Sequence, residues 1–285
     1  MFVRETVERF YDGYGLREWE RLEQDAYHRL IFTRHADFLR PGIAPGRRVL
    51  DAGCGGGRFS LLCAAQGCRV TLLDLSQTQL DIARRQCEKS GVAGQLDGSF
   101  HLSVTDMSAI PDNSFDTVVC YGAVLNYLHE EAPKAVSELT RVTRGGGMLY
   151  VSVNNKDGVL RSCATQLKMP LCDFWGKPEV WGIYQVLETG DEPAYPGASQ
   201  PSRHYFTSAE LHGLLTRSEL TQLTLAAAPA ILTGLRDQAE TLARDPKAWK
   251  VIEDMERSQY QNPAITDCGE FLLARACVQK GGKTP

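Results

Sequence analysis

The sequence predicts an α/β protein built on a doubly wound, mostly parallel sheet of seven strands. Three observations predict this class. From about residue 48 onward, short apolar stretches alternate with stretches of helical periodicity. A glycine-rich turn, within VLDAGCGGGRFS, directly follows the first apolar stretch, and acidic residues stand at the ends of the first three. Open sheets of this kind bind ligands at the carboxyl ends of their strands, so we expect a binding site at that edge.

The expected strands are short runs of apolar and β-branched residues bounded by turn-forming residues. Such continuous apolar runs are typical of strands buried on both faces. We expect strands at 47–53, 68–76, 99–106, 115–122, 146–154, 220–227 and 270–278. The last of these is expected at an edge of the sheet.

Helices are expected between the strands. Ser76 is the expected N-cap of the helix that follows the second strand. Thr207 and Glu210 have the spacing of a capping box, which predicts a helix start. Further helical stretches are expected at 130–147 and at 233–260, the latter interrupted at Pro246.

The chain is expected to divide into four parts. Residues 1–42 predict a helical lid that precedes the sheet, and Pro41 and Gly42 end it. Residues 43–154 form the expected ligand-binding core. Five of the thirteen prolines and two of the four tryptophans fall in the stretch that follows, which has little periodicity. We therefore expect an inserted substrate cap at 155–205, and the rest of the sheet and its helices at 206–285.

Composition restricts the function classes. The net charge of −4 and the pI of about 5.9 argue against a nucleic-acid partner. The N-terminal stretch has no signal-peptide pattern, and no apolar run approaches the ~20 residues of a membrane span. Nine cysteines without a CxxC pair predict reduced thiols and no metal site. We expect a cytoplasmic protein, monomer or homodimer, with neither a membrane nor a nucleic-acid partner.

The glycine turn differs from two other nucleotide-binding motifs. A dinucleotide fingerprint requires its third glycine at position 58, where the chain has Arg58. A P-loop requires a G-K-[ST] sequence, which does not follow. Asp51, at the end of the first strand, would repel a pyrophosphate but suits a ligand that carries an ammonium group.

Two further acidic residues point to a nucleoside. Asp74 ends the second strand, where a carboxylate can accept hydrogen bonds from both hydroxyls of an unphosphorylated ribose. Asp106 ends the expected third strand and precedes Met107. An adenine amino group could donate to Asp106 while the Met107 side chain packs on the ring.

These motifs, in their order, resemble those of the class I S-adenosylmethionine-dependent methyltransferases. The resemblance rests on VLDAGCGGGRFS, VTLLDLS, SVTDMSAIPDNSFDTVVC and LTRVTRGGGMLYVSV, and it spans residues 48–154. It implies a Rossmann-like methyltransferase fold and S-adenosyl-L-methionine as the cofactor. The opening YDGYGLREWERL also resembles the N-terminal segment of that family.

The resemblance also assigns residues to parts of the cofactor. Asp51 with Gly53, Gly55 and Gly57 would hold the methionine moiety, Asp74 with Leu75 the ribose, and Asp106 with Met107 the adenine. Tyr121, after the fourth strand, would lie near the sulfonium and the acceptor. A tyrosine of the N-terminal segment, Tyr11 or Tyr14, would reach the cofactor.

Several histidines and tyrosines are candidate bases. His204 and Tyr205, in RHYFTS, are the preferred candidates, and Tyr121 is a third. His129 is as well explained by a solvated helix start, and His28 and His35 by packing. Aromatic residues of the cap are expected either to wall an acceptor pocket or to form the core of the cap: Phe174, Trp175, Trp181, Tyr184 and Tyr195.

The function predicted from the sequence is methyl transfer from S-adenosylmethionine to a small organic molecule. The sequence leaves open whether nitrogen, oxygen, carbon or sulfur is methylated. Alternatives are an RNA or protein methyltransferase and a catalytically silent S-adenosylmethionine-binding module. An NAD-dependent oxidoreductase is the most remote alternative.

Overall fold

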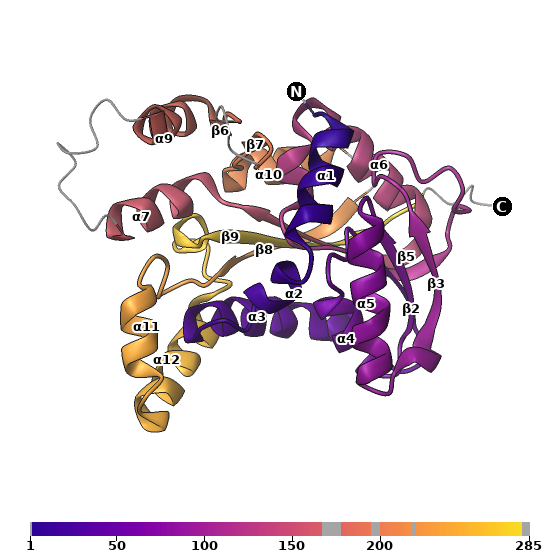
Figure 1. Ribbon diagram of the computed structural model, residues 1–285, viewed down its shortest axis with the longest axis horizontal. Coiled ribbons are helices and arrows are strands. Elements are labelled where there is room, and N and C mark those ends of the chain that lie inside the picture. Colours follow the sequence, from indigo (N-terminus) through magenta and orange to yellow (C-terminus); the bar gives the residue numbers. More distant parts are fainter. Residues whose placement is uncertain (1, 167–177, 195–199, 218–219, 281–285) are drawn as a thin grey trace.

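A seven-stranded sheet forms the centre of the computed structural model, which describes residues 2–166, 178–194, 200–217 and 220–280 (Figure 1). The strand order is β3-β2-β1-β4-β5-β9-β8. The strands are β1 (Arg48–Ala52), β2 (Arg69–Asp74), β3 (Leu96–His101), β4 (Phe115–Cys120), β5 (Thr143–Asn154), β8 (Leu220–Ala228) and β9 (Phe271–Val278). This arrangement confirms the expected mostly parallel, doubly wound sheet.

The two ends of the sheet differ from the expectation. Strands β3, β2, β1, β4 and β5 pair in parallel, whereas β9 pairs antiparallel with both β5 and β8. The expected edge position of 270–278 is therefore wrong, because β8 lies outside β9 and covers it. The third strand ends at His101, five residues before Asp106. The apolar residues after His101 leave the sheet and fold back over the core.

Helices cover both faces of the sheet (Figure 1). On one face lie α3 (Ala26–Leu39), α4 (Arg58–Ala65) and α5 (Gln77–Lys89), and on the other lie α6 (Ala132–Val142) and α10 (Ser208–Thr216). The predicted caps are present. Ser76 accepts a hydrogen bond from the amide of Gln79, and Thr207 and Glu210 form a reciprocal capping box. Each face buries its own apolar cluster.

The remaining elements surround the carboxyl edge of the sheet and its β8 side. The N-terminal α1 (Arg4–Tyr14) and α2 (Arg17–Arg21) lie beside α5 and the edge where the strands end (Figure 1). The expected cap contains α7 (Lys156–Gln166), α9 (Pro178–Thr189) and the hairpin β6 (Asp191–Glu192) and β7 (Arg203–His204). Next come α11 (Arg236–Leu242) and α12 (Pro246–Gln259), with Pro246 as the first residue of α12, as expected from the interruption there. Within the described ranges, no helix has both the length and the apolar character that a bilayer span requires.

Candidate active site

A cavity lies at the carboxyl ends of β1, β2 and β4, where the strand order reverses. We call it the strand-end cavity. Measured to its open mouth it has a volume of about 890 Å³, which is within the range of small-molecule sites. Six residues expected to bind the cofactor line it together: Asp51, Gly53, Gly55, Asp74, Leu75 and Tyr121. Their contacts with a cofactor stay a prediction.

The glycine turn brings the backbone close to its neighbours. Gly53 has φ +79°, and its amide and that of Cys54 donate to the carbonyl of Leu73 at 2.7 and 3.0 Å. A Cβ at Gly53 would overlap the side chain of Val124, so glycine is required by space as well as by φ. Gly57, the last glycine of the turn, lies away from the other two expected cofactor-binding glycines. It caps α4 at φ +87° and packs against Ala83 of α5, outside the strand-end cavity.

Asp74 is held by backbone amides at the end of β2. Its Oδ2 accepts from the amide of Gly55 and its Oδ1 from the amide of Ser76, both at 2.8 Å. Burial nevertheless raises the pKa of Asp74 to about 6. Each oxygen keeps a further lone pair, so the carboxylate can still accept two hydroxyls. This geometry fits a ribose.

Asp51 lies deeper in the same wall. Only 2% of the residue is exposed, and the hydroxyl of Ser60 donates to its Oδ2. Burial raises the pKa of Asp51 to about 7, and the charge of Asp74 adds to the rise. Two buried carboxyl groups whose ionisation is disfavoured would both be stabilised by a cation. The strand-end cavity therefore fits a ligand that joins a positive charge to a ribose, as S-adenosylmethionine does.

The N-terminal helices form the roof of this cavity. Tyr11 of α1 lines it and donates to the hydroxyl of Tyr127 at 3.2 Å, whereas Tyr14 lines a neighbouring cavity. Of the two tyrosines expected to reach the cofactor, the structure brings Tyr11 to the strand-end cavity. Glu18 and Arg21 also line it and form a bidentate ion pair at 3.1 and 2.7 Å.

Asp106 and Met107 do not line the strand-end cavity. The carboxylate of Asp106 is exposed and accepts from the amide of Ser108 at 3.2 Å. The Met107 side chain is fully buried in the cluster beneath α6. The residues that line the cavity after β3 are Leu102, Ser103 and Val104. The expectation that Met107 packs on the adenine is therefore corrected, because the chain turns after His101 and directs this side chain into the core.

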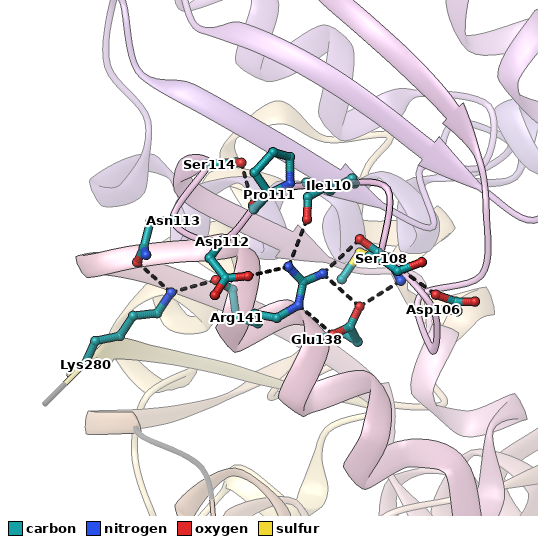
Figure 2. A network of polar contacts seen from close by, with 11 residues as sticks. Asp106, Ser108, Ile110, Pro111, Asp112, Asn113, Ser114, Glu138, Arg141 and Lys280 are labelled. Atoms are coloured by element: carbon teal, nitrogen blue, oxygen red, sulfur yellow. Dashed lines mark hydrogen bonds and ion pairs between the residues drawn. The ribbon is translucent and has the colours of Figure 1, made fainter.

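A polar network holds this turn against α6 (Figure 2). The Arg141 guanidinium donates to the carboxylate of Glu138 at 2.7 and 2.9 Å and to the carbonyls of Met107 and Ile110, both at 2.8 Å. Glu138 in turn accepts from the amide of Met107 at 2.8 Å. The hydrogen bond from Arg141 holds the pKa of Glu138 below its usual value. This arrangement fixes the backbone that leaves the cavity at Val104.

His204 is not placed as a base. Its ring does not line the strand-end cavity or the two cavities beside it, and Nδ1 lies 2.9 Å from Oδ1 of Asp191 across the β6–β7 hairpin. His129 approaches the same carboxylate, with its Nδ1 3.6 Å from Oδ1. The two histidines therefore hold the hairpin to the core, and the preference for His204 as a base is corrected.

The two tyrosine candidates are buried as neutral phenols. Burial raises the pKa of Tyr121 well above its usual value, and its hydroxyl has no partner in the described part of the chain. Its ring packs edge-on against Phe59 and His35, with centroids 5.0 and 5.1 Å away. Tyr205 donates to Glu192 at 2.9 Å, and burial raises its pKa also. Neither hydroxyl is poised to take a proton.

Two further cavities lie in a row beside the strand-end cavity, each sharing lining residues with the one before it. The middle cavity, of about 800 Å³, shares with it Tyr11, Glu18, Arg21, Gly122 and Tyr127. The outer cavity, of about 1010 Å³, shares with the middle one Asn154, Arg203, Arg236 and Glu270. Both volumes include the open mouths.

Sequence reasoning missed most of these shared residues, because they come from six distant segments without a common motif. The only signal was the run of charged residues around Glu18 and Arg21 in the opening stretch.

The other expected residues are placed as follows. His28 lines the middle cavity and bonds to Asp25 at 2.7 Å, and His35 is buried against the carbonyl of Ile31. Burial lowers the pKa of both, that of His35 to about 4. Tyr184 is exposed. The other aromatic residues expected in the cap fall outside the described residues or have side chains that do: Phe174, Trp175, Trp181 and Tyr195.

Known proteins resemble the chain in sequence over less than half of its length. Residues 49–147 match the family of methyltransferase domains. The malonyl-acyl-carrier-protein O-methyltransferase of Serratia marcescens is 36% identical over 108 residues, 38% of this chain and 38% of that protein. The ubiquinone biosynthesis O-methyltransferase of Aromatoleum aromaticum is 36% identical over 116 residues, 41% and 47% of the two chains. The chain thus spans less than half the length of these curated relatives.

Solved structures share the fold over most of the chain. Phosphoethanolamine N-methyltransferase 2 of Haemonchus contortus, in complex with S-adenosyl-L-methionine, has a TM-score of 0.55 at 15% identity and covers 90% of this chain and 56% of its own. Geranyl diphosphate C-methyltransferase of Streptomyces coelicolor has a TM-score of 0.53 at 16% identity, with coverage of 86% and 79%. The matched domain, the strand order and the paired carboxylates agree with one another. Residues 49–147 therefore form a methyltransferase domain, and the chain has the fold of these S-adenosylmethionine-dependent methyltransferases.

Proposed function

We propose that this protein transfers a methyl group from S-adenosylmethionine to a small organic molecule. The observation that carries the proposal is that the three cavities lie side by side and share lining residues. The strand-end cavity has the two carboxylates that suit the cofactor, and its wall at Gly122 and Tyr127 is also the wall of the middle cavity. An acceptor in the middle cavity would thus lie directly beside the cofactor.

The residues that line these cavities would support the reaction by positioning the cofactor and the acceptor and by excluding water. When bound, S-adenosylmethionine supplies a methyl group on a positively charged sulfur. Asp51 and Asp74 would hold the cofactor, and the roof of Tyr11, Glu18 and Arg21 would keep water from it. The amide of Gly122 donates to the hydroxyl of Ser152 at 3.0 Å, which fixes the loop between the two cavities. Positioning of this kind can contribute up to ~7 to 11 kcal/mol to a bimolecular reaction.

The size and charge of the site favour a metabolite over a macromolecule. The middle cavity lies behind Gln200 and Arg203 of the expected cap, and its volume is that of a small-molecule site. Because the net charge is −4, no overall attraction to RNA supports the alternative acceptor. A cytoplasmic location is supported by the free thiols of the eight described cysteines and stays a prediction.

Two measurements on the purified protein test this proposal. Calorimetric titration with S-adenosylmethionine measures cofactor binding, and incubation with methyl-labelled cofactor and a panel of metabolites measures transfer. We expect binding and labelled product from at least one small molecule. Binding without transfer to any metabolite, RNA or protein would instead favour a catalytically silent module. Absence of binding by well-folded protein would overturn both interpretations.

A further inference from the structure

The guanidinium of Arg236 is a partly exposed positive charge between the middle and outer cavities. Arg236 is the first residue of α11 and lines both cavities, and 40% of its side chain is exposed. Its Nε is buried without a hydrogen-bond partner among the residues that the structure describes. Its ion pair with Glu270 is long, with Nη2 3.9 Å from Oε1. An ion pair of that length leaves the donors of the guanidinium available to another group.

Glu270 is turned toward a different partner. Its Oε2 accepts from the hydroxyl of Tyr27 at 2.6 Å and from that of Ser162 at 3.5 Å. The Tyr27 ring in turn lies under the Arg236 guanidinium, 5.4 Å from its centroid. The amide of Gly234 donates to the Tyr27 hydroxyl at 2.9 Å, so this ring is fixed. Tyr27 therefore supports Arg236 from below and holds Glu270 by Oε2, so that Oε1 stays 3.9 Å from the guanidinium and makes no hydrogen bond with it.

The other carboxylates of the two cavities are already paired. Glu18 takes the guanidinium of Arg21 in the bidentate pair described above. Glu192 accepts from Arg203 at 2.5 Å and from the hydroxyl of Tyr205 at 2.9 Å. An ammonium group in these cavities would find no unpaired carboxylate among these three and would meet three arginines. A carboxylate would find the planar donors of Arg236 open.

The length of the acceptor is set by two positions: that of Arg236 and that of the wall shared by the strand-end and middle cavities. Arg236 lines the middle and outer cavities but not the strand-end cavity, whereas Gly122 and Tyr127 line the strand-end and middle cavities. A molecule bound to Arg236 would therefore reach the cofactor with its opposite end. The outer cavity adds aliphatic side chains, among them Leu160, Ile183 and Val186, which suit an apolar part of that molecule.

We propose that the methyl acceptor is a small organic acid whose carboxylate is bound by Arg236. This inference rests on the proposed function and names the substrate class of the same site. The anionic group is an anchor, distant from the atom that is methylated. Arg236 is thus a specificity-determining residue.

The experiment compares matched probes and matched variants. The probes are sets of aliphatic and aromatic carboxylic acids, each with its neutral amide and its corresponding amine, titrated into protein saturated with S-adenosylhomocysteine and assayed with methyl-labelled cofactor. Arg236→Gln removes the charge, and Arg236→Lys keeps the charge without the planar fork. Arg244→Gln is the control, because Arg244 is an exposed arginine of the same α11–α12 hairpin.

We expect the wild-type protein to bind acids at least tenfold more tightly than their amides or amines. Arg236→Gln should raise the Kd and KM for the acids about 10- to 100-fold, because it removes charge-assisted hydrogen bonds to the carboxylate. The change in kcat should be smaller. It should also abolish the discrimination between acid and amide. Arg236→Lys should restore part of the affinity, and Arg244→Gln should behave as wild type. Cofactor affinity should be equal in all four proteins.

Several outcomes would overturn the inference. Preference for amines or amides, absence of binding by any acid, or equal acid affinity in wild type and Arg236→Gln each contradict it. Failure of the proposed function is distinguishable, because the protein would then neither bind S-adenosylmethionine nor transfer its methyl group. The same titration of acids into protein without S-adenosylhomocysteine would still decide whether Arg236 binds a carboxylate.

Discussion

Asp51 and Asp74 lie in one wall of the strand-end cavity, and burial raises the pKa of each, to about 7 and about 6. In the free protein both carboxyl groups therefore titrate close to neutral pH. A cationic ligand favours their ionised forms and lowers their pKa values. Binding of the cofactor must then release protons wherever the free protein still holds them.

The first prediction concerns the pH dependence of cofactor binding. Affinity for S-adenosylmethionine should rise as the pH rises through about 7, because ionised Asp51 binds the cation, and should be roughly tenfold weaker at pH 6 than at pH 8. Calorimetry in two buffers of different ionisation enthalpy would also report the released protons at pH 6. In Asp51→Asn the dependence above pH 6.5 should disappear. Equal affinity of the wild type at pH 6 and pH 8 would contradict this role of Asp51.

The second prediction concerns Asp74. Asp74→Ala should weaken binding of S-adenosylmethionine by about 1.5 to 3 kcal/mol, the size of the charge-assisted hydrogen bonds to the ribose that it removes. Glu88→Ala, an exposed acid of α5, is the matched control and should leave the affinity unchanged. The measurement is the dissociation constant by titration. An unchanged constant in Asp74→Ala would remove the ribose role.

At the scale of elements, the segment after β3 depends on α6. The strand ends at His101, and in the described part of the chain the residues of the following turn pair with no strand. Arg141 and Glu138 supply hydrogen bonds to its backbone, and Lys280 donates to Asn113 and to the carbonyl of Arg141, both at 2.6 Å (Figure 2). Helix α6 thereby holds the backbone whose first residues, Leu102 to Val104, line the strand-end cavity.

The third prediction compares two neighbouring arginines. Arg141→Gln should lower the free energy of unfolding by about 1 to 3 kcal/mol, because buried carbonyls and Glu138 lose their donor. It should also speed amide exchange over 103–114 and weaken cofactor binding. Arg144→Gln breaks only an exposed ion pair with Asp116, so it should cost less than about 1 kcal/mol. Urea unfolding measures both variants, and equal losses would contradict the proposed role of the network.

At the scale of the whole molecule, the N-terminal helices are joined to the sheet by side chains rather than by strands. Gln79 of α5 donates to the carbonyls of Tyr11 and Gly15, both at 3.0 Å. Arg58 donates to the carbonyl of Trp19 at 2.7 Å and stacks on its ring, 3.6 Å from the centroid. Helices α1 and α2 thus form a roof with few buried contacts, which is typical of parts that open locally.

The fourth prediction is that the cofactor closes this roof. Binding of S-adenosylhomocysteine should slow amide exchange in 4–21, because Tyr11, Glu18 and Arg21 line the strand-end cavity. Helix α12 (246–259), on the far side of the molecule from α1, is the internal control and should be unaffected (Figure 1). Exchange by mass spectrometry measures both. A change in α12 without one in α1 and α2 would contradict the prediction.

The sequence by itself determined the sheet, the glycine turn and the two carboxylates. These features depend on local signals. Strands buried on both faces require apolar runs, Gly53 requires a residue without a side chain, and Asp51 and Asp74 follow directly from strand ends. In a parallel sheet, strand ends necessarily meet at one edge, so the sequence order alone brought these carboxylates together.

Only the tertiary structure decided the rest of the site. The position of Met107 depends on where the chain turns after β3, and that turn is set by Arg141, 34 residues later. His204 had the right chemistry for a base, but the β6–β7 pairing directs it to Asp191. Arg236 and Glu270 line the same two cavities and lie close together, although no sequence motif links them. Contacts between distant segments are determined by packing, and a sequence pattern records only the periodicity and the turns of each segment.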